Sequence, residues 1–234
     1  MNKVLNNYRL VLKKMEATQK KFSPAPPHTK LIVVTKTFKD DQIIPILKAG
    51  HTIYGENKVQ EAQTKWQSLK AKYKVELHLI GPLQSNKVRL ALETFDAIQT
   101  IDREKVAKKI IFHLNSDESL SNKSFKFFIQ VNTGNEPQKS GCDMKNAMEF
   151  ILWCKNDLKL QIHGLMCIPP VDENPEKHFD ILNNLANQTS IQFTSMGMTS
   201  DYLLAIKNKA SYVRVGSAIF GKRSIGNNNL RIFF

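Results

Sequence analysis

The chain has 234 residues, of which 41% are hydrophobic and 24% are charged, with ten Gly and nine Pro. This composition is that of an ordinary globular protein and excludes the collagen-like and disordered classes. The longest apolar runs, such as 31–34, fall far short of the roughly 18 residues that a membrane span needs, which excludes a transmembrane protein. The net charge of +13 invites a nucleic-acid interpretation. Most of the basic residues are scattered lysines, however, which favours a solvated surface and no specific nucleic-acid site.

Cysteine usage and the N-terminus indicate the compartment. Cys142, Cys154 and Cys167 are odd in number and lack a CxxC spacing, as expected for reduced thiols and not for disulfides or a zinc site. Residues 1–21 contain no apolar h-region, so no secretory signal is expected. We therefore predict a cytoplasmic protein that binds neither a membrane nor a metal.

The predicted elements begin with a helix at 1–22, in which Tyr8, Val11 and Met15 follow helical spacing. A proline-rich hinge follows at 24–27. From there on, short apolar runs alternate with longer segments of helical period. The expected strands are 31–36, 52–55, 76–81, 97–100, 125–132, 162–168, 191–196 and 212–216. The expected helices between them are 40–49, 58–73, 86–95, 103–114, 144–155, 175–188 and 199–207.

This alternation predicts parallel strands joined by right-handed crossovers. Eight such units in about 200 residues match a closed (β/α)8 TIM barrel, an α/β fold, here with an extra N-terminal helix packed on it. An open doubly wound sheet is the main alternative, but it usually carries a glycine-rich first turn, and the sequence contains neither GxGxxG nor GxxxxGK[ST]. Since no repeat or linker divides the chain, we expect a single domain over 1–234.

The ends of the last two strands are candidates for an anion site. In a TIM barrel, the loops after the seventh and eighth strands commonly hold phosphate. The seventh strand ends in SMGMT at 195–199 and the eighth in RVGS at 214–217, two turns in which glycine and hydroxyl groups suit an oxyanion. The alternative interpretations are a plain helix cap at Thr199 and a tight turn at Gly216.

Lys36 and Arg214 are the charged candidates beside these turns. Lys36 ends the first strand, where partial desolvation would make its amine available for Schiff-base chemistry, although a surface ion pair is the common alternative. An aldehyde-reactive amine beside a phosphate turn indicates a pyridoxal 5′-phosphate (PLP) pocket. Arg214 alternates with Val213 and Val215 and is expected to point into the barrel, toward a ligand or a carboxylate. Against a pyridine nitrogen, it would keep that nitrogen unprotonated and the ring a weak electron sink.

Several sequence blocks spread over nearly the whole chain carry a resemblance to a known family. The blocks are VTKT at 34–37, YGEN at 54–57, VQE at 59–61, HLIG at 78–81, LQSNK at 83–87, VNT at 131–133, KSG at 139–141, GLM at 164–166, SMGMT at 195–199 with Asp201, VRVGS at 213–217 and IFG at 219–221. In them the chain resembles the pyridoxal phosphate homeostasis proteins, whose fold is similar to the barrel domain of alanine racemase. Lys58 and Thr199 depart from the family pattern, in which an aromatic residue and a serine are frequent at these positions.

The resemblance implies a PLP-binding barrel and gives roles to its residues. Lys36 would form the internal aldimine, and Arg214 would face the pyridine nitrogen. Thr199 and the turn at 216–217 would hold the phosphate, and Asn57 would lie close to the ring. The implied cofactor-binding residues are thus Lys36, Asn57, Thr199, Arg214, Gly216 and Ser217.

Two functions are compatible with a PLP pocket, and a barrel that binds sugar phosphate or a lysine-rich nucleic-acid binder is a third, more distant interpretation. In racemases and decarboxylases of this barrel type, a β domain follows the barrel, and a partner subunit supplies a second catalytic group. Here 18 residues follow Gly216, and Lys36 alone can serve as an acid–base group, whereas a racemase needs such groups on both faces of the substrate carbon. We therefore expect a monomeric, non-catalytic protein of intracellular PLP homeostasis that stores the cofactor or delivers it to apo-PLP-enzymes. A PLP-dependent racemase or decarboxylase is the alternative.

Four further features are left with two interpretations each. His78 is expected to be a hydrogen-bonded structural histidine or, as the alternative, an acid–base group. The loops at 84–87 and 139–141 are expected to be solvated or to contact a partner. Cys167 is expected to be an inert core thiol, with a reactive thiol as the alternative.

Overall fold

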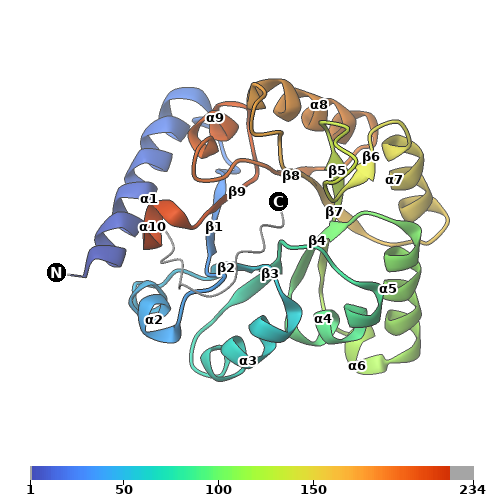
Figure 1. Cartoon of the computed structure of the whole chain (residues 1–234), viewed down its shortest axis with the longest axis horizontal. Helices are drawn as coiled ribbons and strands as arrows, with labels where there is room; N and C mark the ends of the chain where they lie inside the picture. Colours follow the sequence, from blue (N-terminus) through green and yellow to red (C-terminus); the bar gives the residue numbers. More distant parts are fainter. Residues whose placement is uncertain (1, 222–234) are drawn as a thin grey trace.

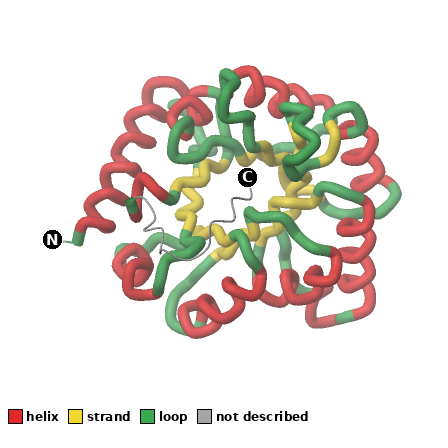
Figure 2. Tube along the Cα trace, viewed as in Figure 1, coloured by secondary structure: helices red, strands yellow, loops and turns green. Residues whose placement is uncertain are grey.

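Eight parallel strands form a closed ring, and the helices surround it (Figure 1). The structure is a computed structural model that describes residues 2–221; Met1 and residues 222–234 of the expected 1–234 domain lie outside the described residues. The strands of the ring are β1 (Lys30–Val34), β2 (Ile53–Glu56), β3 (Glu76–Leu79), β4 (Ala97–Ile101), β5 (Lys126–Asn132), β7 (Ile162–Cys167), β8 (Phe193–Ser195) and β9 (Tyr212–Val215). The predicted TIM barrel is confirmed, with the strands inside and the helices outside (Figure 2).

The barrel closes where its first and last strands pair. Each strand of the ring pairs in parallel with the next strand of the ring, including β4 with β5. The first and last strands of the ring meet, with Ile32 opposite Arg214 and Val33 opposite Val215. This pairing brings the end of β1 next to the end of β9, as the sequence predicts for Lys36 and the turn at 216–217.

The helices follow the expected segments with differences at their ends. They are α2 (Asp40–Lys48), α3 (Val59–Lys70), α4 (Val88–Thr94), α5 (Glu104–Ser116), α7 (Ala147–Asn156), α8 (Pro175–Gln188) and α9 (Tyr202–Lys207). Four short elements were not expected: η1 (Ser85–Lys87), α6 (Glu118–Ser121), β6 (Cys142–Asp143) and α10 (Ser217–Phe220).

The helix expected to begin at Thr199 begins only at Tyr202, with Asp201 as its N-cap residue. The Asp201 carboxylate accepts a hydrogen bond from the Met198 amide at 2.6 Å, and the Tyr202 amide donates to the Met198 carbonyl at 2.8 Å. Residues 198–202 therefore form a separate turn before the helix. The Asp201 side chain stabilises this turn, because an Asp side chain can accept from nearby backbone amides in place of a helical hydrogen bond. The interpretation of Thr199 as a plain helix cap is wrong.

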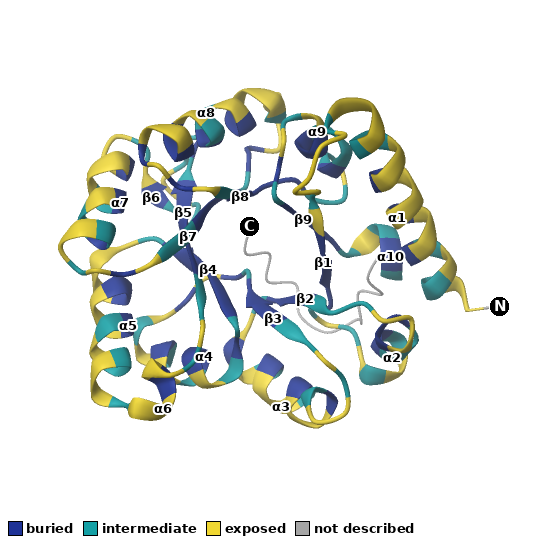
Figure 3. Ribbon diagram, turned by 180° about the vertical axis from the view of Figure 1, so that it is seen from behind, coloured by how far each residue is buried: buried dark blue, intermediate teal, exposed yellow. Residues whose placement is uncertain are grey.

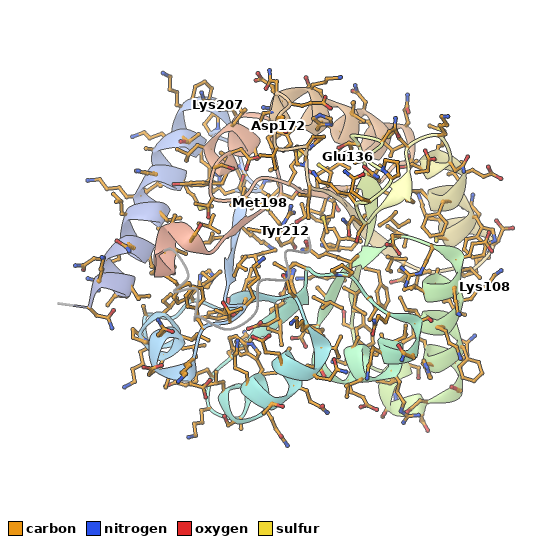
Figure 4. The ribbon with its side chains drawn as sticks, viewed as in Figure 1. Lys108, Glu136, Asp172, Met198, Lys207 and Tyr212 are labelled. Carbon is orange, nitrogen blue, oxygen red and sulfur yellow. The ribbon has the colours of Figure 1, made fainter. Side chains whose placement is uncertain are left out.

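The barrel has two apolar regions, one on each side of its strands. Buried side chains fill the space between the strands and the helices, as Figure 3 shows for the helix faces turned toward the sheet. A smaller cluster of Ile32, Phe128, Met166 and Tyr212 lies inside the ring, and Figure 4 shows Tyr212 near the barrel centre. Since residues alternate along a strand, the inward positions next to this cluster also carry polar side chains, among them Arg214.

The N-terminal helix α1 (Lys3–Phe22) packs against α2, α9 and α10 on the outside of the barrel. Its buried residues Tyr8, Val11 and Met15 lie on one face, as their spacing predicts. The Asn2 side chain caps the helix by accepting from the Val4 amide at 3.0 Å. No helix within residues 2–221 is long and apolar enough to cross a membrane.

Candidate functional site

A cavity of about 440 Å³ opens at the C-terminal ends of β1, β2, β3, β7 and β9, beside the segment that follows β8. This is a typical size for a small-molecule or cofactor site. All six residues that the sequence singles out line it, although they come from distant parts of the chain. The described residues around the cavity are Val34, Lys36, Phe38, Asn57, Ile80, Ile168, Met198, Thr199, Ser200, Arg214, Gly216, Ser217 and Gly221.

Lys36 is held in place by hydrogen bonds to the residues on both sides of it. On one side, the Thr35 carbonyl accepts from Lys65 Nζ at 2.9 Å. On the other side, the Thr37 amide donates to Glu61 Oε1 at 2.9 Å, and Thr37 has a positive φ of 69°. Both partners belong to α3, so this helix fixes the sharp turn that carries the half-buried Lys36 into the cavity.

Glu56 at the end of β2 is the centre of this attachment. Its fully buried carboxylate oxygen Oε1 accepts from Thr35 Oγ1 at 2.7 Å, from Lys65 Nζ at 2.9 Å and from Trp66 Nε1 at 3.1 Å. A buried carboxylate is tolerated only when it is paired and hydrogen-bonded. Glu56 therefore ties the ends of β1 and β2 to α3 directly behind Lys36.

Asn57 follows Glu56 and is positioned by close backbone packing. Its backbone lies against Gly81 at the end of β3, where a Cβ atom at Gly81 would overlap the Asn57 carbonyl oxygen. Any side chain at Gly81 would push Asn57 away from the cavity. The HLIG block at 78–81 thus contributes to the site through the close packing of its glycine, and its Ile80 side chain lines the cavity.

The two glycine-containing turns lie next to each other at the cavity. Gly197 has φ 87°, and a Cβ atom there would overlap Ala205 Cβ, so only glycine allows the turn that presents Thr199. Gly216 lies against Val34, where a Cβ atom would come within 3.1 Å of the Val34 carbonyl oxygen. Within residues 2–221, the hydroxyls of Thr199 and Ser217 make no hydrogen bond and are available to a ligand in the cavity.

Arg214 points from β9 into the barrel and reaches the cavity floor, with an exposed fraction of only 3%. Its guanidinium donates from Nη1 to Ser195 Oγ and from Nη2 to the Cys167 carbonyl, both at 2.8 Å. Burial lowers the pKa of Arg214 from its ordinary value, but an arginine stays charged in proteins. No carboxylate among residues 2–221 forms an ion pair with it. The structural ion pair that was the alternative interpretation is absent from the described part of the chain.

The other candidate residues lie away from the cavity. His78 is fully buried inside the barrel, where Nε2 contacts Glu76 Oε1 at 2.7 Å and Nδ1 accepts from Gln99 Nε2 at 2.9 Å. Burial lowers the pKa of His78. Cys167 is fully buried, and burial raises the pKa of its thiol to about 12, so it is an inert core residue as expected.

The loops at 84–87 and 139–141 do not line the cavity either. The first forms the short helix η1. In the second, Lys139 pairs with Glu136 at 2.6 Å, and the Ser140 carbonyl accepts from Gln130 Nε2 at 3.0 Å. Both are partly exposed, and Lys58 is exposed as well.

The sequence did not identify Glu56, Gln99 and Ser195 as parts of the site. Each is a fully buried polar residue inside a predicted strand or at its end. A polar side chain in an otherwise apolar run was the available signal, but its partners come from other strands and cannot be seen in the run itself.

The chemistry of the cavity fits PLP. The cofactor carries an aldehyde, a phosphate, a pyridine nitrogen and two apolar ring faces. The described lining residues offer one amine, two turns with hydroxyls, one guanidinium and the apolar side chains Val34, Ile80 and Ile168. None of them is acidic, which favours an anionic ligand. Residues 2–221 contain no group of three His, Cys, Asp or Glu side chains that could hold a metal ion.

The fold and this cavity define a class of protein: a parallel barrel with a lysine and an anion-binding turn on adjacent strands. The family model described as "Alanine racemase, N-terminal domain" matches residues 11–224. Two curated relatives are each named pyridoxal phosphate homeostasis protein. That of Haemophilus influenzae is 35% identical over 94% of this chain and 96% of its own, and that of Escherichia coli is 32% identical over 95% and 98%. The chain belongs to the family of pyridoxal phosphate homeostasis proteins, as the resemblance in its sequence blocks indicates.

Solved structures agree with this assignment. PipY of Synechococcus elongatus, solved with PLP bound, is 31% identical with a TM-score of 0.74 and covers 89% of this chain and 100% of its own. Alanine racemase of Acinetobacter baumannii is 14% identical with a TM-score of 0.67 and covers 90% and 61%, respectively, which shows a shared fold alone.

The attachment of Lys36 to α3 can be tested by changing Lys65. Lys65→Met should lower the free energy of unfolding by about 3–5 kcal/mol, because it leaves the Glu56 carboxylate buried without a countercharge. The double variant Lys65→Met/Glu56→Gln should recover part of this loss. Urea unfolding measures both.

Lys70→Met is the matched control on the same helix. Lys70 pairs with Asp96 at 2.7 Å, but both side chains are more than a quarter exposed, so its loss should cost about 1 kcal/mol or less. Equal losses for Lys65→Met and Lys70→Met would contradict the role given to Glu56.

Proposed function

We propose that this protein binds PLP in the cavity at the end of the barrel and acts in cofactor homeostasis, storing PLP or delivering it to apo-enzymes. The main support for this proposal is that Lys36, Arg214 and residues of the turns at 195–199 and 214–217 line one cavity of suitable size. The relatives' names and the PLP in PipY support the proposal. It treats residues 1–234 as one domain and the protein as a monomer.

When bound, PLP supplies an aldehyde that an amine can hold covalently and a ring that withdraws electrons. The side chains of this protein divide the work of binding. The Lys36 amine would form the covalent link, while Thr199, Ser217 and the backbone N–H groups at the start of α10 would bind the phosphate. Arg214 would donate to the pyridine nitrogen, and Asn57 would lie beside the ring.

Catalytic turnover is not part of the proposal. Among the described residues that line the cavity, Lys36 and Arg214 are the titratable ones, and arginine is a poor proton acceptor at neutral pH. Racemisation needs a proton donor and a proton acceptor on opposite faces of the substrate carbon. Because a guanidinium can donate a hydrogen bond but not accept one, Arg214 also favours an unprotonated pyridine nitrogen and so a weaker electron sink. These properties support a carrier over a racemase or decarboxylase.

Borohydride trapping tests where the cofactor binds. After incubation with PLP and reduction, peptide mapping should find the cofactor on Lys36, because this is the lysine among residues 2–221 that lines the cavity. Lys36→Ala should lose the absorption of bound PLP, whereas Lys58→Ala, which changes the nearby exposed lysine, should keep it. Labelling spread evenly over surface lysines would refute the site.

Hydrogen exchange at the α-carbon separates a carrier from an enzyme. In heavy water, the loaded protein should incorporate no more deuterium into alanine and other amino acids than the same concentration of free PLP does, because a second proton-transfer group is lacking. The protein should also load an apo-enzyme with PLP faster than free PLP does at matched concentration. Rapid exchange that Lys36→Ala abolishes would identify an enzyme and overturn the carrier.

A further inference from the structure

The interior of the barrel contains a continuous chain of polar side chains that begins at Arg214. Barrel interiors are usually filled by layers of branched apolar residues. Here Arg214, Ser195, Gln99 and His78 come from β9, β8, β4 and β3, and each is at most 3% exposed. Buried polar groups cost free energy unless they are hydrogen-bonded. In this protein each of them bonds the next.

The links are short and connect the two ends of the barrel. Arg214 Nη1 donates to Ser195 Oγ at 2.8 Å, and Ser195 Oγ donates to Gln99 Oε1 at 2.7 Å. Gln99 Nε2 donates to His78 Nδ1 at 2.9 Å, and His78 Nε2 lies 2.7 Å from Glu76 Oε1. Glu76 begins β3 at the end of the barrel opposite the cavity, where it pairs with Lys126 at 2.7 Å.

The chemistry of the two terminal groups gives this chain one direction. A guanidinium only donates, so Ser195 must accept from Arg214 and give its own proton to Gln99. The Gln99 amide then turns its NH₂ to His78, which makes Nδ1 an acceptor and leaves the imidazole proton on Nε2. At the other end, hydrogen bonds from His78 and Lys126 lower the pKa of Glu76 to about 2 despite its burial, so the carboxylate only accepts. The opposite orientation would set a His78 lone pair against that carboxylate.

We propose that Ser195, Gln99, His78 and Glu76 are positioning residues for Arg214, which fix its guanidinium from behind so that it meets the ligand in the cavity in one orientation. Arg214 is the buried end of the chain and its one member that lines the cavity. Among the described residues, these hydrogen bonds take the place of an ion pair to Arg214. The acceptor is the Ser195 hydroxyl, and Gln99 and His78 connect that hydroxyl to the distant Glu76 carboxylate. The inference rests on the proposed function for the nature of the ligand, but not for the direction of the chain.

The direction can be measured in the protein without PLP. Nitrogen-15 NMR should show His78 as a neutral imidazole with the proton on Nε2. Gln99→Glu should convert His78 to the imidazolium form, because a carboxylate replaces the NH₂ group that donates to Nδ1. A proton on Nδ1 in the unchanged protein, or a neutral His78 in a folded Gln99→Glu variant, would overturn the proposed chain.

The effect on Arg214 is tested by removing one small hydroxyl. Ser195→Ala should weaken PLP binding roughly tenfold and shift the absorption band of the bound cofactor, since a charged donor loses an acceptor. Thr194→Ala is the matched control: it removes a buried hydroxyl from the neighbouring position, which points to the opposite face of β8. It should change neither quantity.

The outcomes separate this inference from the proposed function. If Ser195→Ala binds PLP with unchanged affinity and spectrum, the positioning role is wrong although PLP binding stands. If the unchanged protein does not bind PLP at all, the proposed function fails, and the NMR result alone decides whether the one-way chain exists.

Discussion

A positive charge buried inside a closed barrel is the constraint on which this site depends. Arg214 lies on an inward position of β9 with almost no exposure to solvent, and the described chain provides no countercharge beside it. Its charge is tolerated because the Ser195 hydroxyl and the Cys167 carbonyl accept its protons. Both acceptors belong to strands near β9 in the ring, and Ser195 in turn donates to Gln99 of β4 across the barrel, so the orientation of Arg214 depends on the closed barrel.

Closure also determines where Lys36 lies relative to Arg214. The pairing of β1 with β9 sets Ile32 opposite Arg214. The side chains of Lys36 and Arg214 therefore both reach the cavity at the same end of the barrel. The link between Glu56 and α3 then fixes the turn that carries Lys36. An amine and a guanidinium are thus held at fixed positions around one cavity, each through a buried polar group. Such a rigid arrangement suits a protein that binds one cofactor and releases it unchanged, because nothing has to be rebuilt at each cycle.

The sequence predicts the barrel well because alternating strand and helix segments depend on local periodicity. It also identifies the six candidate residues that the structure brings to one cavity. It fails at Thr199, where the Asp201 side chain bonds the Met198 amide and delays the start of α9 to Tyr202. It also fails to find Gln99 as a partner of His78, because Gln99 is 21 residues away and on another strand. Contacts between strands depend on strand register and on closure of the barrel, and neither can be predicted from the local sequence.

The proposed role of Arg214 is to donate a hydrogen bond to the pyridine nitrogen of PLP bound at Lys36. The most direct test is nitrogen-15 NMR of the protein loaded with PLP that is labelled at the pyridine nitrogen. We expect the chemical shift of an unprotonated, hydrogen-bonded pyridine, because a guanidinium cannot accept the proton of a pyridinium. In Arg214→Gln, whose side-chain oxygen could accept that proton, the shift should move toward the pyridinium value. A pyridinium shift in the unchanged protein would show that Arg214 does not have this role.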